Sequence, residues 1–299
     1  MIKYLLSDDN REFNSGKRPH KGPLPHGYKP DLDVMDECDA KHVSRFQQLI
    51  GVLRWAVQLG SIDIQVEVPL LSQYQAFPKE VHLEALYLIF HFLSNNPKKI
   101  LVMDPIIPNI DGSVFNNNTD LKYFYGDVVE KDPHQITEPL GRPVYFGCLI
   151  DADHVGNVIT RRLHSGILFF VNRALIKSFS KRQNTIKLSM FGSDLVVLRI
   201  ERCVIVEIRI KLKVFGVPLD GLENLFCDNT GVVKNTSIPG STLSKKHNTI
   251  NYHCMSEAST FGILCLRKED TATNLANPLT KLIPFSRKQE LLGCLLYGY

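Results

Sequence analysis

The 299-residue sequence has no apolar run long enough to cross a membrane, which argues against a membrane-spanning helix. Its longest apolar stretches, "ALYLIFHFL" and "GILFFVNRALI", are too short and contain His91 and Arg173. The start, "MIKYLLSDDN", has neither a long apolar segment nor a small-residue cleavage site. We therefore expect no membrane partner and no secretion, and a location in the cytoplasm or the nucleus.

Cysteine patterns and common catalytic motifs are also missing. The seven cysteines are an odd number and show no Cys-x-x-Cys spacing, which excludes a disulfide framework and argues against a zinc site. No Gly-rich phosphate loop or paired Ser–His constellation occurs. "LSDDN" at 6–10 lacks the tyrosine of a polymerase motif, and "DADHVG" lacks the Gly-Thr that follows a phosphatase nucleophile. Polymerases, phosphatases and nucleotide-binding P-loop proteins are therefore excluded.

Positive charge is concentrated in one half of the chain. Residues 1–143 hold 15 Lys and Arg against 19 Asp and Glu, a balance of −4, while residues 144–299 hold 20 against 12, a balance of +8. The basic half also contains the pair Asp151 and Asp153. A basic domain with a local acidic cluster indicates a phosphate backbone at its surface and a metal ion within. A solvated basic surface without a ligand is the alternative.

The sequence "LIDADHVGN" ends an apolar run with two aspartates. On a strand, Asp151 and Asp153 point to the same face, because side chains repeat every two residues. Two like charges on one face repel each other, and a metal ion would make the arrangement tolerable. For an isolated Asp-x-Asp pair, a strand that ends in a solvated turn is the better explanation, unless further carboxylates converge on it.

The first half of the chain divides into three parts. Residues 1–35 are polar and rich in Pro and Gly, which indicates a flexible arm or linker. Residues 36–103 show helical spacing of apolar residues in "VSRFQQLIGVLRWAV" and "KEVHLEALYLIFHFLSNN", so we expect a helical region. Residues 104–143 carry Pro, Gly and Asn at short intervals and are interpreted as an irregular connector, preceded by a short strand at 100–103.

The second half, residues 144–299, is interpreted as an α/β domain with a C-terminal tail. Strands are expected at 144–150, 166–172 and 175–179, followed by a helix over about 189–215 whose apolar residues keep a period near 3.6. A strand at 223–228, a mostly helical segment at 241–261, a strand at 262–268 and a loop entering a helix at 269–283 complete it. This order predicts an α/β mixed sheet with flanking helices.

Three carboxylates are expected to meet at one end of this sheet. Asp151 ends the first strand, Asp228 ends the fourth, and Asp194 lies in the first turns of the long helix. Open α/β sheets place their sites at such an edge. Oxygen ligands of this kind suit Mg²⁺, and two such ions can clamp the attacking and leaving oxygens of a phosphodiester.

Several ordered motifs resemble a known family. "LIDADHVGNVITRRLHSGILFFVNRALIKSFSKRQNT", "FGSDLVVLRI", "LFCDNTGVVKNTS", "STLSKKHNTINYHCMSEA" and "TNLANPLTKLIP" look like the ribonuclease H domain of a copia-type LTR retrotransposon polyprotein. The helical part is similar to the thumb and connection that follow the reverse transcriptase palm there. The resemblance spans roughly residues 43–285 and implies a ribonuclease H-like mixed sheet, preceded by a smaller thumb-like helical region.

The resemblance also implies a catalytic set. The family's four acidic metal ligands, in the order Asp, Glu, Asp, Asp, fall on Asp151, Asp194, Asp228 and Asn277. The implied cofactor is Mg²⁺ or Mn²⁺, with two ions if the domain is active. The implied partner is an RNA–DNA hybrid or other nucleic acid, together with other parts of the retrotransposon polyprotein. Basic residues expected to contact phosphate are Arg161, Arg162, Lys181, Arg182, Lys245 and Lys246.

Two of the four ligand positions depart from the family pattern. Asp194 is one methylene shorter than the family's Glu, and a misplacement of about 1 Å can cost roughly 10²-fold in rate. Asn277 has no negative charge, and Pro278 disfavours the helical conformation for it, so we expect Asn277 as a helix cap with Pro278 at the first position. The sequence therefore predicts a ribonuclease H-type endonuclease with impaired cleavage, or a catalytically dead nucleic-acid-binding remnant of the mobile element.

Two other carboxylates are alternative ligands. Asp153 could replace Asp151, although the family pattern favours Asp151. Glu201 lies on the same helical face as Asp194, but two turns place it roughly 10 Å away.

Overall fold

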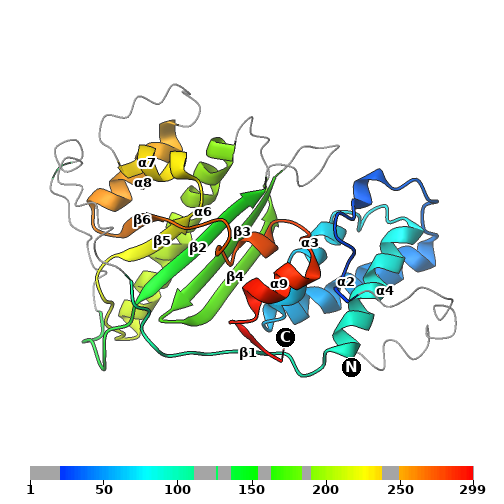
Figure 1. The fold of residues 1–299 in the computed structure, drawn as a ribbon, viewed down its shortest axis with the longest axis horizontal. Helices are drawn as coiled ribbons and strands as arrows, with labels where there is room; N and C mark the ends of the chain where they lie inside the picture. The colour runs from blue at the N-terminus through cyan, green and yellow to red at the C-terminus, as the bar shows by residue number, and fades with distance from the viewer. Residues whose placement is uncertain are drawn as a thin grey trace.

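The computed structural model describes residues 21–110, 126, 136–153, 163–183, 190–237 and 249–298. In these ranges a five-stranded sheet lies beside a bundle of helices, and the C-terminal segment lies between the two (Figure 1). Within the described part of the chain, no helix has both the length and the apolar character needed to cross a membrane.

The helical region consists of α2 (Ala40–Gln58), α3 (Glu67–Ser72) and α4 (Glu80–Asn95), with short 3₁₀ turns η1 (Pro30–Leu32) and η2 (Ile62–Ile64). The side chain of Asp39 caps α2 by accepting a hydrogen bond from the His42 amide. Both predicted apolar stripes are confirmed, since their central residues are buried: Phe46, Leu49, Ile50 and Leu53 in α2, and Leu83, Leu86, Ile89 and Phe90 in α4. Helix α3 was not predicted, because six residues are too few to show a period.

The sheet has the strand order β4-β3-β2-β5-β6. Strands β2 (Phe146–Asp153), β3 (His164–Val171) and β4 (Ala174–Arg182) pair antiparallel, while β5 (Glu223–Cys227) and β6 (Leu264–Lys268) are parallel to β2. The predicted α/β mixed sheet is confirmed. The prediction that the first strand stops at 150 is wrong, because Asp151 and Asp153 continue the ladder opposite Gly166 and His164.

One face of the sheet is covered by α6 (Met190–Val214), α7 (Thr230–Ser237) and α8 (Thr249–Thr260). Helix α6 confirms the predicted helix at 189–215, and its buried Leu198 and Ile205 pack against Ile150 and Phe169 of the sheet. Between β5 and β6 the described residues form two helices, α7 and α8, where we expected one helical segment over 241–261.

The opposite face is covered by the C-terminal segment. It contains η5 (Asn277–Leu279), α9 (Phe285–Leu292) and β7 (Leu296–Tyr297), and β7 pairs with β1 (Ile100–Leu101). Leu168 of β3, Leu279 and Leu292 share a core there. The helix expected to begin near 277 is only one 3₁₀ turn, and the α-helix starts at Phe285 instead, after Pro284. Proline at 278 removes a backbone donor, which is consistent with so short a turn.

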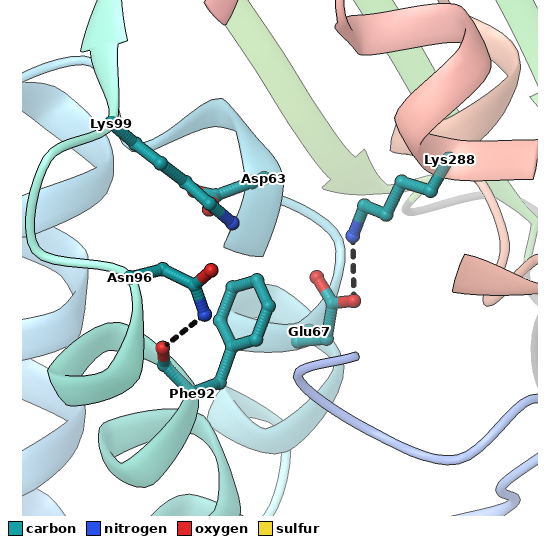
Figure 2. Close-up of polar contacts among 6 residues, drawn as sticks. All are labelled: Asp63, Glu67, Phe92, Asn96, Lys99 and Lys288. Carbon is teal, nitrogen blue, oxygen red and sulfur yellow. Dashed lines mark hydrogen bonds and ion pairs between the residues drawn. The ribbon is translucent and has the colours of Figure 1, made fainter. Parts of the chain in front are cut away.

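Two buried ion pairs join the helical region to segments that follow it (Figure 2). Lys288 of α9 donates to Glu67 of α3 at 2.7 Å, and Lys99 contacts Asp63 of η2 at 3.0 Å. All four side chains are at most 8% exposed. The ammonium of Lys99 also lies 4.0 Å from the centre of the Phe92 ring. The C-terminal helix is therefore packed against the helical region, with Lys288 buried at the contact.

Candidate metal centre

Asp151 lies in the middle strand of the sheet and faces away from α6. Its neighbours Ile150 and Ala152 pack in the core with α6, so strand alternation places the Asp151 side chain on the opposite face. There the Thr280 hydroxyl donates a hydrogen bond to Asp151 Oδ2 at 2.5 Å, and the aspartate is 5% exposed. The turn η5, which positions Thr280, therefore also fixes the orientation of Asp151.

The paired residue Gly166 explains how η5 comes so close to the sheet. A Cβ atom at this position would lie 2.7 Å from the backbone oxygen of Ala276 and 2.9 Å from Thr280. These contacts are shorter than side chains tolerate, so a larger residue at 166 would displace η5. Glycine here is a requirement of the site geometry.

Asp194 reaches the same end of the sheet from α6. It is 2% exposed, and its Oδ2 accepts a hydrogen bond from Asn229 Nδ2 at 2.7 Å. Burial, with smaller contributions from the negative charges of Asp151 and Asp228, raises the pKa of Asp194 to about 7 against the opposing effect of the Asn229 hydrogen bond. Asp194 thus lies within electrostatic reach of both other aspartates that the sequence singled out.

Asp228 directly follows β5 and is half-buried. Its Oδ2 accepts a hydrogen bond from the Thr271 hydroxyl at 2.9 Å, and its backbone oxygen accepts one from the Lys268 ammonium. Asp228 is therefore held from the loop that follows β6.

Asn229 is a site residue that the sequence reasoning missed. Its Oδ1 accepts hydrogen bonds from the backbone amides of Gly231, at 3.0 Å, and Val232, at 3.3 Å, at the start of α7, while its Nδ2 donates to Asp194. It acts as an N-cap and holds Asp194 at the same time. The sequence "DNTG" carries a signal for the cap, but none for the contact with a residue 35 positions earlier.

Asn277 is the first residue of η5, and its side-chain oxygen is buried without a hydrogen-bond donor. The cap prediction is wrong in register, because Ala276 takes the N-cap position and makes no side-chain cap bond. A buried carbonyl oxygen without a donor is costly in a folded protein. It is also an oxygen that is available to a cation.

The chemical character of these oxygen ligands suits a divalent cation. Three carboxylates and one orphaned amide oxygen offer only oxygen ligands with net negative charge, which suits Mg²⁺ or Mn²⁺. The distances between these side chains are too long for a shared ion: within the described ranges, no three Asp, Glu, His or Cys side chains lie together closely enough to hold a metal ion. Asp151, Asp194 and Asp228 each have a separate hydrogen-bond donor, and Asp194 comes from the other face of the sheet with a short side chain.

Glu201, the alternative ligand on α6, is fully buried in the core. Its Oε1 lies 3.7 Å from the Cys148 thiol, and its Oε2 has no hydrogen-bond partner. Burial raises the pKa of Glu201 well above its usual range, and the hydrogen bond with Cys148 lowers it by a smaller amount. The side chain of Asp153, the other alternative, lies outside the described residues.

Two of the six predicted phosphate contacts can be placed. Lys181 and Arg182 end β4; Lys181 is exposed, and Arg182 Nη1 donates to Gln73 Oε1 of the helical region at 2.5 Å. The other four, Arg161, Arg162, Lys245 and Lys246, lie outside the described residues.

No family model matches the sequence. Among solved structures, the chain is similar to the N-terminal RNase H domain of a Mycobacterium tuberculosis protein fused with maltose-binding protein, at 13% identity and a TM-score of 0.37, covering 49% of this chain and 98% of that chain. It is also similar to the foamy viral protease-reverse transcriptase in complex with an RNA/DNA hybrid, at 12% identity and a TM-score of 0.31, covering 68% of this chain and 34% of that one.

A further structure of the prototype foamy virus protease-reverse transcriptase matches at 12% identity and a TM-score of 0.33, covering 86% of this chain and 50% of that chain. This chain thus spans half or less of the foamy virus protein. The predicted mixed sheet is confirmed by the strand order, with three antiparallel strands followed by two that run parallel to the first.

Proposed function

We propose that this chain is a retrotransposon-derived fragment whose ribonuclease H-like domain acts on RNA–DNA hybrids, with impaired cleavage. The proposal includes the copia-type origin and the thumb-like character of residues 36–103, which follow from the sequence motifs. The domain would act in the cytoplasm or the nucleus, alone or with other parts of the polyprotein.

One observation carries the proposal: Asp194 is buried in α6, and the negative charges of Asp151 and Asp228 add to the pKa increase that this burial causes. Carboxylates brought together in this way are unfavourable unless they are protonated or a cation binds between them. Such arrangements are typical of functional sites. The position, at the end of the central strands of the sheet, agrees with where α/β folds place their chemistry.

In this proposal Asp151, Asp194 and Asp228 hold the cation, and Asn277 contributes a neutral oxygen. Bound Mg²⁺ or Mn²⁺, two ions in an active enzyme, would supply the positive charge that activates a water molecule and stabilises the phosphate. Thr280 and Asn229 orient the Asp151 and Asp194 carboxylates through their hydrogen bonds. Thr271 does the same for Asp228.

Impairment follows from two of these residues. The Asp194 side chain is one methylene short for a ligand that must reach past the sheet end, and Asn277 lacks the charge that would hold a second ion. Together they leave fewer than three acidic ligands at one point in the described chain.

The test is an RNA-cleavage assay on a hybrid with a labelled RNA strand, in Mg²⁺ and in Mn²⁺. The chain as written is compared with a variant that carries Asp194→Glu and Asn277→Asp. We expect the variant to cleave at least about 10²-fold faster, since both changes restore ligand reach and charge. Adding Asp151→Asn to the variant serves as the control and should abolish the gain.

A second function, hybrid binding without turnover, is favoured by the separate hydrogen-bond donors of the three aspartates. It predicts that both proteins bind hybrid and that neither cleaves it. A chain that neither binds nor cleaves hybrid, in either form, would overturn both functions.

A further inference from the structure

A groove runs between the helical region and the edge of the sheet. It has a volume of about 830 Å³ and is walled by α2 and α3 on one side and by β4 on the other. Strand β4 is the edge strand of the sheet, so its outer backbone groups face the groove. Gln65 and Ser178 meet between the walls, with the Ser178 hydroxyl donating to Gln65 Oε1 at 2.6 Å.

The groove is positively charged. Arg54 of α2 and Lys177, Lys181 and Arg182 of β4 line it, and no Asp or Glu is among the described residues that do so. Arg54 Nε donates to Ser72 Oγ at 3.3 Å, and the Lys177 ammonium lies 4.9 Å from the Phe179 ring centre. These contacts orient the side chains, and Glu207, whose charge interacts with that of Lys177, is not among the described lining residues.

The dimensions of the groove fit one strand of nucleic acid. Its β4 wall runs from Leu175 to Arg182, seven steps or about 23 Å at roughly 3.3 Å per residue. The volume of about 830 Å³ lies in the range of pockets that hold small ligands, which is too little space for a duplex. The length is sufficient for several phosphates.

The lining favours contacts to phosphate over contacts to bases. Serine and glutamine side chains, with exposed cations, are typical donors to phosphate oxygens. Phe179 is the one aromatic residue among the described lining residues, and it packs into the core of the sheet. A site without stacking platforms binds the backbone with little sequence preference.

We propose that this groove binds the phosphate backbone of a single RNA or DNA strand. The inference rests on the proposed function for its ligand class, nucleic acid, and adds a second contact surface apart from the acidic site. In this inference Lys181 and Arg182 contact phosphate together with Arg54 of the helical wall and Lys177 of the edge strand.

The test measures binding of a fluorescently labelled oligonucleotide of twelve nucleotides, in EDTA so that no metal-dependent step contributes. The variant Arg54→Gln, Lys177→Gln, Lys181→Gln is compared with a matched control, Lys98→Gln, Arg199→Gln, Lys211→Gln, which removes the same charge from exposed positions outside the groove. We expect the groove variant to bind at least about tenfold more weakly and its salt slope to fall by about 2, from three contacts at roughly 0.7 each. The control should retain both values.

Circular dichroism and urea unfolding of each variant establish that all are folded to the same extent.

Equal losses in the two triple variants would overturn the inference, because they would show non-specific attraction to net charge. Binding that a duplex or an acidic peptide displaces more effectively than a single strand would also overturn it. The proposed function fails separately, in the hybrid-cleavage assay with Mg²⁺, so a groove that binds a strand in a chain that never cleaves leaves this inference supported.

Discussion

Buried charges are treated differently in the helical region and at the end of the sheet. In the helical region each buried carboxylate has a lysine: Glu67 has Lys288 and Asp63 has Lys99, in contacts of 3.0 Å or less. At the sheet end Asp194 is equally buried, but its contacts are an amide and two further negative charges. The first arrangement is complete without a ligand. The second has no lysine or arginine among the described contacts of Asp194 and would be stabilised further by protonation or by a cation from solution. This difference distinguishes a structural pair from a candidate site.

The largest effect on stability is expected from Lys288→Met, which removes the lysine that pairs with the buried Glu67. Glu67 would keep its charge in a buried position, where burial already raises its pKa against the opposing effect of Lys288. Breaking a buried pair in this way costs about 3–5 kcal/mol of unfolding free energy, measurable by urea denaturation.

Two further proteins control this prediction. Lys98→Met, at an exposed neighbour of the other lysine, should change stability by less than about 0.5 kcal/mol. Adding Glu67→Leu to Lys288→Met should recover most of the loss, since an apolar pair of similar size can replace a buried ion pair. If Lys288→Met were as stable as the original chain, the buried charges of the helical region would not depend on their lysines, and the difference between the two regions would not hold.

A pH-dependent effect of about 3 kcal/mol is expected from His164, which is 4% exposed on β3. Ser180 donates its hydroxyl hydrogen to the Leu279 carbonyl, so Ser180 Oγ accepts a hydrogen bond from His164 Nε2 at 2.8 Å. Burial, with the charge of Arg182, lowers the pKa of His164 to about 4. Because the folded pKa is lower than the unfolded one, stability is lost as pH falls from about 6.5 to about 4, by about 3 kcal/mol for such a difference.

The measurement is urea unfolding of His164→Gln and of the original chain between pH 7 and pH 4. Glutamine keeps a donor near Ser180 and cannot be protonated, so the variant should lose less stability on acidification. His26→Gln, at an exposed histidine, is the control and should follow the original chain. Parallel pH profiles for all three proteins would contradict the assignment of a neutral buried imidazole.

The smallest effect, roughly 1–3 kcal/mol, is expected from Glu201→Gln, which removes a buried carboxyl group without a lysine. The pKa of Glu201 is raised in the folded state, so its ionised form opposes folding at high pH, and the variant should gain stability relative to the original chain as pH rises above about 4.5. Glu207→Gln, on the exposed side of the same helix, should show no such gain. A stabilisation that does not grow with pH would place Glu201 among the satisfied core residues.

The regular elements were predictable where a long or repeated pattern exists. Helix α6 keeps its period over 25 residues and was recognised close to its observed bounds. Helices α3 and α9 are six and eight residues long, and no period can be read from so few positions. The turn at Asn277 follows local proline chemistry, which indicated a break in the helix without fixing its register.

The site was predictable only as a list of residues. Strand alternation gives the face of Asp151 relative to its neighbours, but which of the two faces α6 covers depends on contacts between residues far apart in the sequence. The same holds for Asn229, whose partner Asp194 lies on another element, and for the groove, whose cations Arg54 and Lys177 come from separate regions. Such pairings are decided by packing of the whole chain.

The ion pair between Glu67 and Lys288 also sets an order of events during synthesis. The two residues are 221 positions apart, whereas Asp63 and Lys99 are separated by only 36. At about 5–20 residues per second, a ribosome needs roughly 11–44 s to add the lysine after the glutamate has been made. During that interval the Asp63–Lys99 pair can form but the Glu67–Lys288 pair cannot. The helical region, which is made first, is therefore completed only after the C-terminal helix has been made.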